Sequence, residues 1–222
     1  GNNVGLKYLV NEKKCGYVFI ANPDVIFEDS TIREMHKTML EHPDIALIAT
    51  KRYGHDGATL HQYFDFPKLT TSMKNCFFFS RRKFEKRRHF MQNMRIDMAE
   101  GPAYVDAVPG AFFGIKSEFL LKNDFIYEGI FLYGEEIVLG HQAHDLGYKA
   151  AVINTDMYIH DHIQKRFSNR KMFWYDRQSL KKYYRLFEHY NLIQWALLNG
   201  AIVLGSAEYN CMYYLYKALR GK

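Results

Sequence analysis

Short apolar runs alternate with amphipathic stretches along the first 50 residues. Residues 17–21 (YVFIA) form an unbroken apolar and aromatic run, too short for a buried helix, which predicts a strand covered on both faces. Between Ser30 and about Glu41 apolar residues recur at helical spacing, and Ser30 can cap that helix. Residues 45–49 (IALIA) predict a second buried strand. A helix between two apolar strands is typical of a βαβ unit in a parallel sheet.

The same alternation returns beyond residue 100. The patterns predict strands at 104–108 and 149–153, an extended segment at 157–162, and helices at 117–121 and 135–145. Residues of about 52–102 interrupt the rhythm, and the last third becomes helical and aromatic. We therefore expect an α/β domain over residues 1–168 that carries an insertion at about 52–102, followed by a helical region over 169–222.

The composition of the chain indicates its partners and its cellular setting. The chain has 222 residues, a formal net charge of +6 and 16% aromatic residues, which suits anionic partners such as nucleotides, nucleic acid or an acidic membrane surface. Its three cysteines, Cys15, Cys76 and Cys211, are far apart in the sequence, which predicts reduced thiols and a cytoplasmic setting. No uninterrupted apolar stretch of about 18 residues occurs, so we expect no transmembrane helix.

Two segments have alternative interpretations. The insertion combines the run 77–79 (FFF) with basic residues between 81 and 89, which is typical of nucleic-acid binding, of a solvated helix face, or of an acceptor site for an anionic or glycan substrate. Nucleic acid is the less favoured partner. The apolar stretches 192–204 and 212–219 predict helices that either pack on the domain or lie at a membrane surface.

Candidate chemistry begins where the first strand ends. Pro23 cannot donate to a sheet ladder, so the strand should stop there and leave Asn22 and Asp24 on the turn at its carboxyl end. Ligands of open α/β sheets bind at that edge. A carboxylate held there suits a hard divalent cation that is also bound by substrate phosphates.

Two further polar groups extend this pattern. Glu135 and Glu136 open a predicted helix, and burial with mutual repulsion would raise the pKa of one of them, as a general base requires. His160 and His162 share one face of an extended segment. A cation, a diphosphate site and a base are what sugar transfer from a nucleotide donor requires.

These residues carry a resemblance to a known family. The chain resembles the family-2 glycosyltransferases of the GT-A fold, especially bacterial rhamnosyltransferase-like members. The matching segments are 3–5 (NVG), 17–24 (YVFIANPD), 105–111 (VDAVPGA), 131–136 (FLYGEE), 147–149 (GYK) and 160–168. Their order and spacing cover roughly the first 170 residues. The resemblance implies a mostly parallel sheet flanked by helices, with a helical C-terminal extension.

The resemblance also implies roles for the metal site and the base. Asp24 matches the second acid of the family's metal motif, and Asn22 replaces the first. Either His160 or His162 matches the late metal-ligand histidine. Glu135 and Glu136 match the acidic pair whose second member resembles the catalytic base, which makes Glu136 the preferred base.

Contacts to substrate are implied in the same way. The donor-binding residues implied are Asn3, Gly5, Asn22, Gly110 and Ala111. The acceptor-binding residues implied are Asp106, Tyr133 and Glu135. The cofactor that the resemblance implies is Mg²⁺ or Mn²⁺, the implied donor is a nucleoside-diphosphate sugar such as dTDP-rhamnose, and the implied acceptor is a polysaccharide or a lipid-linked glycan.

One part of the family pattern has no counterpart here. The family opens with roughly 70 to 90 residues that hold the nucleotide base, and we expect this chain to be a fragment that lacks them, since a sheet without its first strands would expose apolar edges. The predicted enzyme is an inverting, metal-dependent hexosyltransferase of the cytoplasm or of the inner membrane face. The rival classes are a non-catalytic glycan- or nucleic-acid-binding domain and a nucleotidyltransferase-like enzyme, which would need more carboxylates around two metals.

Overall fold

The computed structural model describes residues 2–130, 133–161 and 170–220, without the side chains of 82–86, 170–171 and 220. The chain forms two compact units. Unit 1 comprises residues 1–66, 89–129 and 135–163, and unit 2 comprises 67–88, 130–134 and 164–222. These units differ from the predicted segments, because residues 67–88 of the expected insertion belong with the C-terminal helices.

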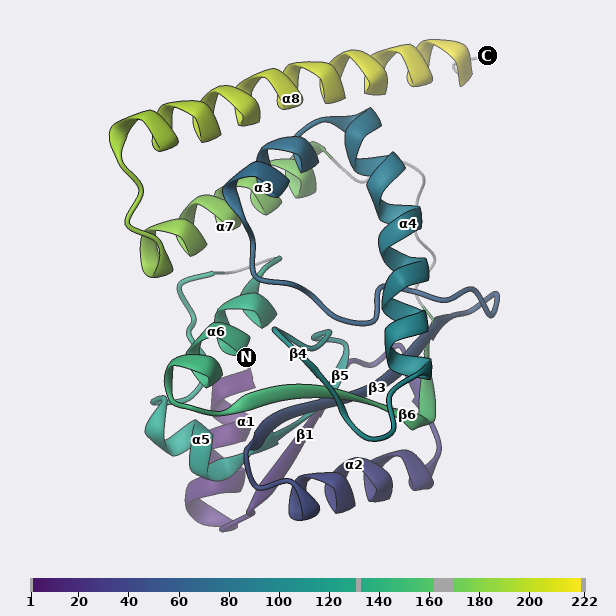
Figure 1. The fold of residues 1–222 in the computed structure, drawn as a ribbon, viewed down its shortest axis with the longest axis vertical. Helices are drawn as coiled ribbons and strands as arrows, with labels where there is room; N and C mark the ends of the chain where they lie inside the picture. The colour runs from purple at the N-terminus through teal and green to yellow at the C-terminus, as the bar shows by residue number, and fades with distance from the viewer. Residues whose placement is uncertain (1, 131–132, 162–169, 221–222) are drawn as a thin grey trace. The chain divides into compact units, whose positions relative to one another are not determined.

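A six-stranded sheet forms the centre of unit 1 (Figure 1). Its strands are β1 (Tyr17–Ala21), β2 (Val25–Phe27), β3 (Ile45–Gly54), β4 (Ala103–Val105), β5 (Phe112–Lys116) and β6 (Lys149–His160). The order is β1-β5-β3-β6-β2, and β4 also pairs with β6. Helices cover both faces, so the predicted α/β class with a central flanked sheet is confirmed.

The pairing of the strands differs from the mostly parallel sheet that was expected. β3 and β6 pair in parallel, whereas the other pairings of the described strands are antiparallel. β5 lies between β1 and β3, so these two strands are not neighbours. Apolar patterning marks a segment as a strand, but it does not specify the partner, because a buried strand has the same composition beside a parallel or an antiparallel neighbour.

The helices of unit 1 pack on the sheet through two apolar clusters. They are α1 (Asn2–Lys7) with the π-helical turn η1 (Tyr8–Glu12), α2 (Asp29–Glu41), α5 (Ser117–Lys122), α6 (Glu135–Asp145) and the second half of α4 (Phe78–Asp97). Met35 and Met39 of α2 are fully buried on one face, and Phe119 and Leu139 belong to the cluster on the other. The predicted helix 135–145 is confirmed.

The expected cap of α2 is wrong in detail. The helix begins at Asp29, and Glu28 occupies the cap position without a side-chain hydrogen bond to the backbone. The hydroxyl of Ser30 instead donates to Asp156 Oδ2 at 2.7 Å. The Ser30 hydroxyl therefore bonds to a residue distant in the sequence, and it does not cap its own helix as the local sequence predicted.

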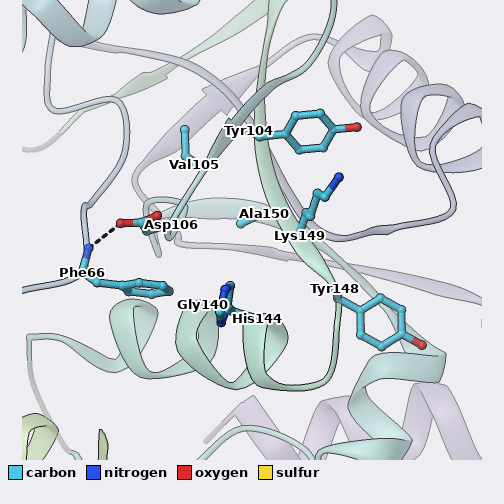
Figure 2. A pocket seen from close by; sticks show the side chains of 9 residues that line it. All are labelled: Phe66, Tyr104, Val105, Asp106, Gly140, His144, Tyr148, Lys149 and Ala150. Atoms are coloured by element: carbon cyan, nitrogen blue, oxygen red, sulfur yellow. Dashed lines mark hydrogen bonds between the residues drawn. The ribbon is translucent and has the colours of Figure 1, made fainter. Parts of the chain in front are cut away.

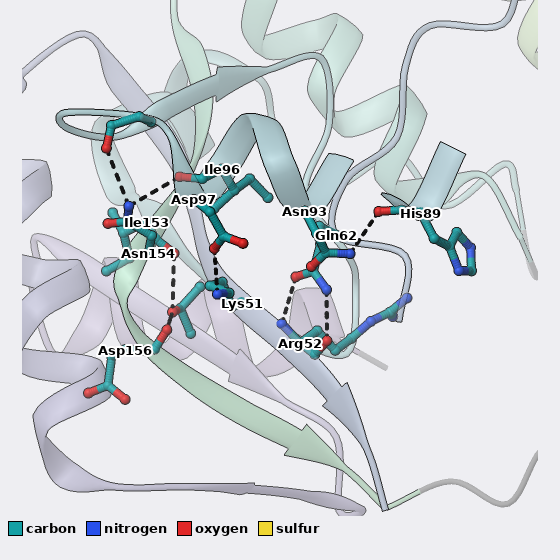
Figure 3. Close-up of polar contacts among 12 residues, drawn as sticks. Lys51, Arg52, Gln62, His89, Asn93, Ile96, Asp97, Ile153, Asn154 and Asp156 are labelled. Atoms are coloured by element: carbon teal, nitrogen blue, oxygen red, sulfur yellow. Dashed lines mark hydrogen bonds and ion pairs between the residues drawn. The ribbon is translucent and has the colours of Figure 1, made fainter. Parts of the chain in front are cut away.

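Polar contacts fix the second half of α4 and the loop that follows β3 against the sheet (Figure 3). Gln62 is fully buried, and its side chain accepts from the Arg52 N–H at 2.7 Å and donates to the Arg52 carbonyl at 2.8 Å. Lys51 and Asp97 form an ion pair at 2.6 Å. Asn154 donates to the Ile96 carbonyl at 3.1 Å, so β3 and β6 are both tied to α4.

Unit 2 is helical, as the aromatic last third predicted. It contains α3 (Leu69–Asn75), the first half of α4, α7 (Arg170–Phe187) and α8 (Leu192–Arg220). The fully buried hydroxyl of Tyr184 donates to Ser72 Oγ at 2.7 Å and joins α7 to α3. Phe173 stacks on Tyr209 at 4.2 Å and joins α7 to α8. Among the described residues, no helix has the length and apolarity needed to cross a membrane.

Candidate functional site

Asp24 and His160 meet at one end of the sheet. Asp24 directly precedes β2, and the register of β2 on β6 places Val25 opposite His160. His160 Nε2 consequently lies 3.4 Å from Asp24 Oδ1. The imidazole is mostly buried and the carboxylate is partly exposed. The two predicted metal ligands that the structure describes are therefore adjacent, whereas His162 lies outside the described residues.

A second acid–imidazole pair lies beside the first and was not predicted. The backbone N–H of Asp161 donates to the Asp24 carbonyl at 2.8 Å, and Asp161 Oδ1 lies 2.6 Å from His55 Nδ1. His55 follows Gly54, which is paired with His160 in the β3–β6 ladder. No sequence signal identified His55 or Asp161, because their proximity depends on the register of two strands distant in sequence.

A chain of contacts leads from the end of β1 to the start of α6. It consists of Asn22, Ala111, Gly110 and Glu136. The Asn22 N–H donates to the Ala111 carbonyl at 2.8 Å. A Cβ added at the neighbouring Gly110 would lie 2.6 Å from Glu136 Oε1, so glycine is what allows the Glu136 side chain to lie against the backbone there. Four predicted site residues are thus brought together at the start of α6.

The two glutamates at the start of α6 differ in electrostatic environment. Burial, followed by the negative charge of Glu136, raises the pKa of Glu135 to about 7. One carboxylate oxygen of Glu135, Oε2, is buried and accepts no hydrogen bond from the part of the chain that the structure describes. The sequence predicted a raised pKa for one member of the pair, and the structure identifies Glu135 as that member.

Tyr158 and Arg52 add a buried polar pair that sequence reasoning did not identify as functional. The β3–β6 register places Arg52 beside Tyr158. Tyr158 is 1% exposed, and burial raises the pKa of its hydroxyl to about 12, against the opposite effect of the Arg52 guanidinium. Within the described residues, the Tyr158 hydroxyl and Arg52 Nε are both buried and neither meets the geometric criteria of a hydrogen bond. The Glu136 carboxylate also acts on Tyr158, which places the tyrosine near the predicted base.

Asp106 lines a pocket whose lining residues do not include Gly110 or Glu136. The pocket has a volume of about 150 Å³ and lies along the C-terminal half of α6 (Figure 2). Asp106 Oδ2 accepts from the Phe66 N–H at 2.7 Å. The other lining residues are Tyr104, Val105, Gly140, His144, Tyr148, Lys149 and Ala150. Figure 2 shows Asp106 and Phe66 on one side of the hollow and Tyr104 with Lys149 on the other.

The remaining predicted contact residues are Asn3, Gly5 and Tyr133. The Asn3 side chain donates to the Ile126 carbonyl at 2.7 Å and accepts from the Ile126 N–H at 3.1 Å, which is a structural use of the amide. Gly5 lies within α1, and a Cβ added there would meet no described atom within 4 Å. Tyr133, with a φ of 61°, belongs to unit 2.

The described donor set can contribute two ligands to a cation. Within the described residues, no three His, Cys, Asp or Glu side chains group together as a metal site. Two ligands of one ion at about 2.1 Å are roughly 3 Å apart, which is close to the 3.4 Å between Asp24 and His160. The pair therefore fits a cation that takes its other ligands from substrate phosphates and water, as Mg²⁺ commonly does.

Comparison with known proteins identifies the fold. No protein-family model and no curated protein matches the sequence. Among solved structures, the crystal structure of GalNAc-T7 with UDP, GalNAc and Mn²⁺ is similar, with a TM-score of 0.52 and 10% sequence identity. The similarity covers 83% of this chain and 33% of that one, so the chain spans about a third of the neighbour's length. The chain therefore has the GT-A fold of glycosyltransferases.

Proposed function

We propose that this protein is an inverting, metal-dependent glycosyltransferase that uses a nucleoside-diphosphate sugar. The observation that carries the proposal is a pair of contacts at the end of β1. Asp24 contacts His160 there. Asn22 bonds to Ala111, whose neighbour Gly110 lies against the Glu136 carboxylate. On a GT-A fold, these contacts put a candidate cation site and a candidate base on connected segments.

Asp24 and His160 would hold the cation, which is Mg²⁺ or Mn²⁺. When bound, such a cation neutralises the negative charge that develops on the departing diphosphate. The similar GalNAc-T7 structure contains UDP and Mn²⁺, which supports this choice of cofactor and donor class. Asn22, Gly110 and Ala111 would line the donor, since Asn22 is two residues from Asp24 and bonds to Ala111, and Gly110 contacts Glu136.

Glu136 would act as the general base that removes the proton from the attacking acceptor hydroxyl. The contact of its carboxylate with the Gly110 backbone, beside the segment that would line the donor, supports this role. Glu135, with a pKa of about 7, can instead donate a hydrogen bond to the acceptor.

The substrate follows from the resemblance noted in the sequence. We propose a growing polysaccharide or a lipid-linked glycan as acceptor and a hexose donor such as dTDP-rhamnose, with Asp106 and Tyr133 as further acceptor contacts. Asp106 lies in a pocket flanked by tyrosine rings, which suits a sugar, because aromatic faces pack well against apolar sugar faces. The proposed location is the cytoplasm or the inner face of the membrane.

The test is a transfer assay on the full-length protein with UDP-, dTDP- and GDP-sugars and Mn²⁺ or Mg²⁺. Glu136→Gln should lower kcat by at least about 10³-fold while donor binding is retained, because it removes the base and leaves the cation site. Asp24→Ala should abolish metal-dependent donor binding as well. Glu128→Gln, at an exposed carboxylate, is the matched control and should leave both unchanged.

Two results would reject the proposal. Wild-type turnover in Glu136→Gln or Asp24→Ala would remove these residues from the chemistry. Binding of glycan without any donor hydrolysis or transfer by the wild-type protein would instead identify a non-catalytic domain on a transferase fold.

A further inference from the structure

The outer face of α8 is an uninterrupted apolar surface. Exposed residues recur every three or four positions along this helix, which is about 43 Å long. From Leu192 to Tyr216, every exposed position is uncharged. We call these positions the α8 stripe: Leu192, Ile193, Ala196, Leu197, Gly200, Val203, Leu204, Ala207, Cys211, Tyr214 and Leu215.

The opposite face of α8 is already occupied within unit 2. Leu198, Ile202 and Tyr209 are buried, and a Cβ at Gly205 would overlap the Cys76 carbonyl at the end of α3. The single charged residue between 192 and 216 is Glu208, whose carboxylate accepts from the Phe78 N–H at 2.9 Å. The helix is thus apolar on both faces, and one of them has no cover from the described residues. Contiguous apolar surface of this kind marks an interaction site.

The charge of the chain is concentrated in the same unit. By sequence, unit 2 has 19 Lys and Arg against 4 Asp and Glu, a net charge of +15. Unit 1 has the remaining 11 Lys and Arg against 20 Asp and Glu, a net charge of −9. The net charge of +6 for the whole chain hides this division. The apolar stripe therefore belongs to a strongly cationic body.

We propose that the α8 stripe docks on an anionic lipid surface, with α8 lying in the plane of the interface. Membrane-surface helices combine buried apolar area with attraction of cationic residues to anionic headgroups, and unit 2 has both. Tyr213, Tyr214 and Tyr216 near the C-terminal end of α8 have the amphipathic rings that favour the headgroup region. The exposed Lys217 lies next to them.

Charge and side-chain chemistry separate this occupant from two others. Two copies of a unit with a net charge of +15 repel each other, which disfavours a dimer through the stripe. Nucleic acid would satisfy the charge, but its binding uses aromatic stacking and cations, and it leaves aliphatic side chains such as Leu197 and Leu204 without a partner. An anionic lipid surface satisfies both features.

The experiment is co-sedimentation of the full-length protein with vesicles of phosphatidylcholine alone or with 30% phosphatidylserine. We expect binding to the anionic vesicles that weakens as salt is raised. Leu197→Glu and Leu204→Glu should each weaken binding at least about tenfold, because each removes a leucine from the lipid contact and adds a negative charge. Lys217→Gln should weaken it about fivefold.

Leu40→Glu is the matched control, because Leu40 is an exposed leucine on α2 in unit 1 and should leave vesicle binding unchanged. Equal loss in this control, or no binding of the wild type to anionic vesicles, would overturn the proposal. Sedimentation equilibrium without vesicles provides a second check: a dimer that Leu204→Glu dissociates would assign the stripe to self-association. Vesicle binding does not depend on Glu136, so failure of the transferase proposal would leave this result unchanged.

Discussion

The raised pKa of Glu135 makes folding stability depend on pH in a defined direction. Burial and the charge of Glu136 raise this pKa from 4.5 to about 7. Between these values the folded protein holds a proton that the unfolded chain has released, so this carboxyl lowers stability as pH rises from about 4.5 to above 7. Glu135→Gln removes the titrating group and should remove this part of the pH dependence.

The size of the effect follows from the same pKa. A rise from 4.5 to about 7 corresponds to about 3 kcal/mol for full ionisation, and partial solvent exposure of the side chain reduces this to about 2 kcal/mol. We therefore expect Glu135→Gln to be about 2 kcal/mol more stable than wild type at pH 8, relative to the difference between the two proteins at pH 4.5. Glu136→Gln should give a smaller gain, because it leaves the larger cause, burial, in place.

Urea denaturation at several pH values between 4.5 and 8 measures this difference. The comparison between pH values is the informative quantity, because the new amide also lacks a partner for the buried oxygen and shifts stability equally at every pH. Glu128→Gln, on an exposed carboxylate, should show no such change with pH. A Glu135→Gln variant whose stability difference from wild type is the same at pH 4.5 and pH 8 would refute the reasoning.

Two further predictions concern close packing at glycine. Gly110→Ala should reduce transfer at least about 100-fold with little change in the urea midpoint, because the new Cβ displaces the Glu136 carboxylate rather than the backbone. An unchanged kcat/KM would contradict the contact between Gly110 and Glu136. Gly205→Ala should destabilise unit 2 by about 2 kcal/mol, because its Cβ meets the Cys76 carbonyl. Gly200 lies one and a half turns earlier, on the exposed face of the same helix, and Gly200→Ala should instead stabilise unit 2 by about 1 kcal/mol. Equal denaturation curves for the two variants would show that α8 does not approach α3 this closely.

Local patterns identified several elements correctly. The apolar run 17–21 became β1, and helical periodicity between residues 135 and 145 became α6 with the same bounds. These predictions succeeded because burial leaves an apolar run or an apolar period in the sequence, and either is visible without the fold. Local patterns missed β5 and the short strand β2. β2 has three residues, which carry too little pattern to be distinguished from a turn.

Register and partner choice came from tertiary structure alone. Asp24 and His160 were named separately, but their 3.4 Å approach depends on the antiparallel pairing of β2 with β6. The same ladder geometry brings His55 to Asp161, which no local pattern indicated. Asp106 was implied as an acceptor contact by resemblance, and only the folded chain shows that it lines a pocket along α6.

The amino-acid sequence determined several of the strands and helices, and it located Asp24, His160 and the glutamate pair at their ends. The tertiary structure decided which strands pair, which glutamate has the raised pKa and which face of α8 remains uncovered. The division has a physical reason. Periodicity records that a residue is buried or exposed, whereas pairing, desolvation and the contacts of a side chain depend on residues distant in the chain, whose positions exist only once the protein has folded.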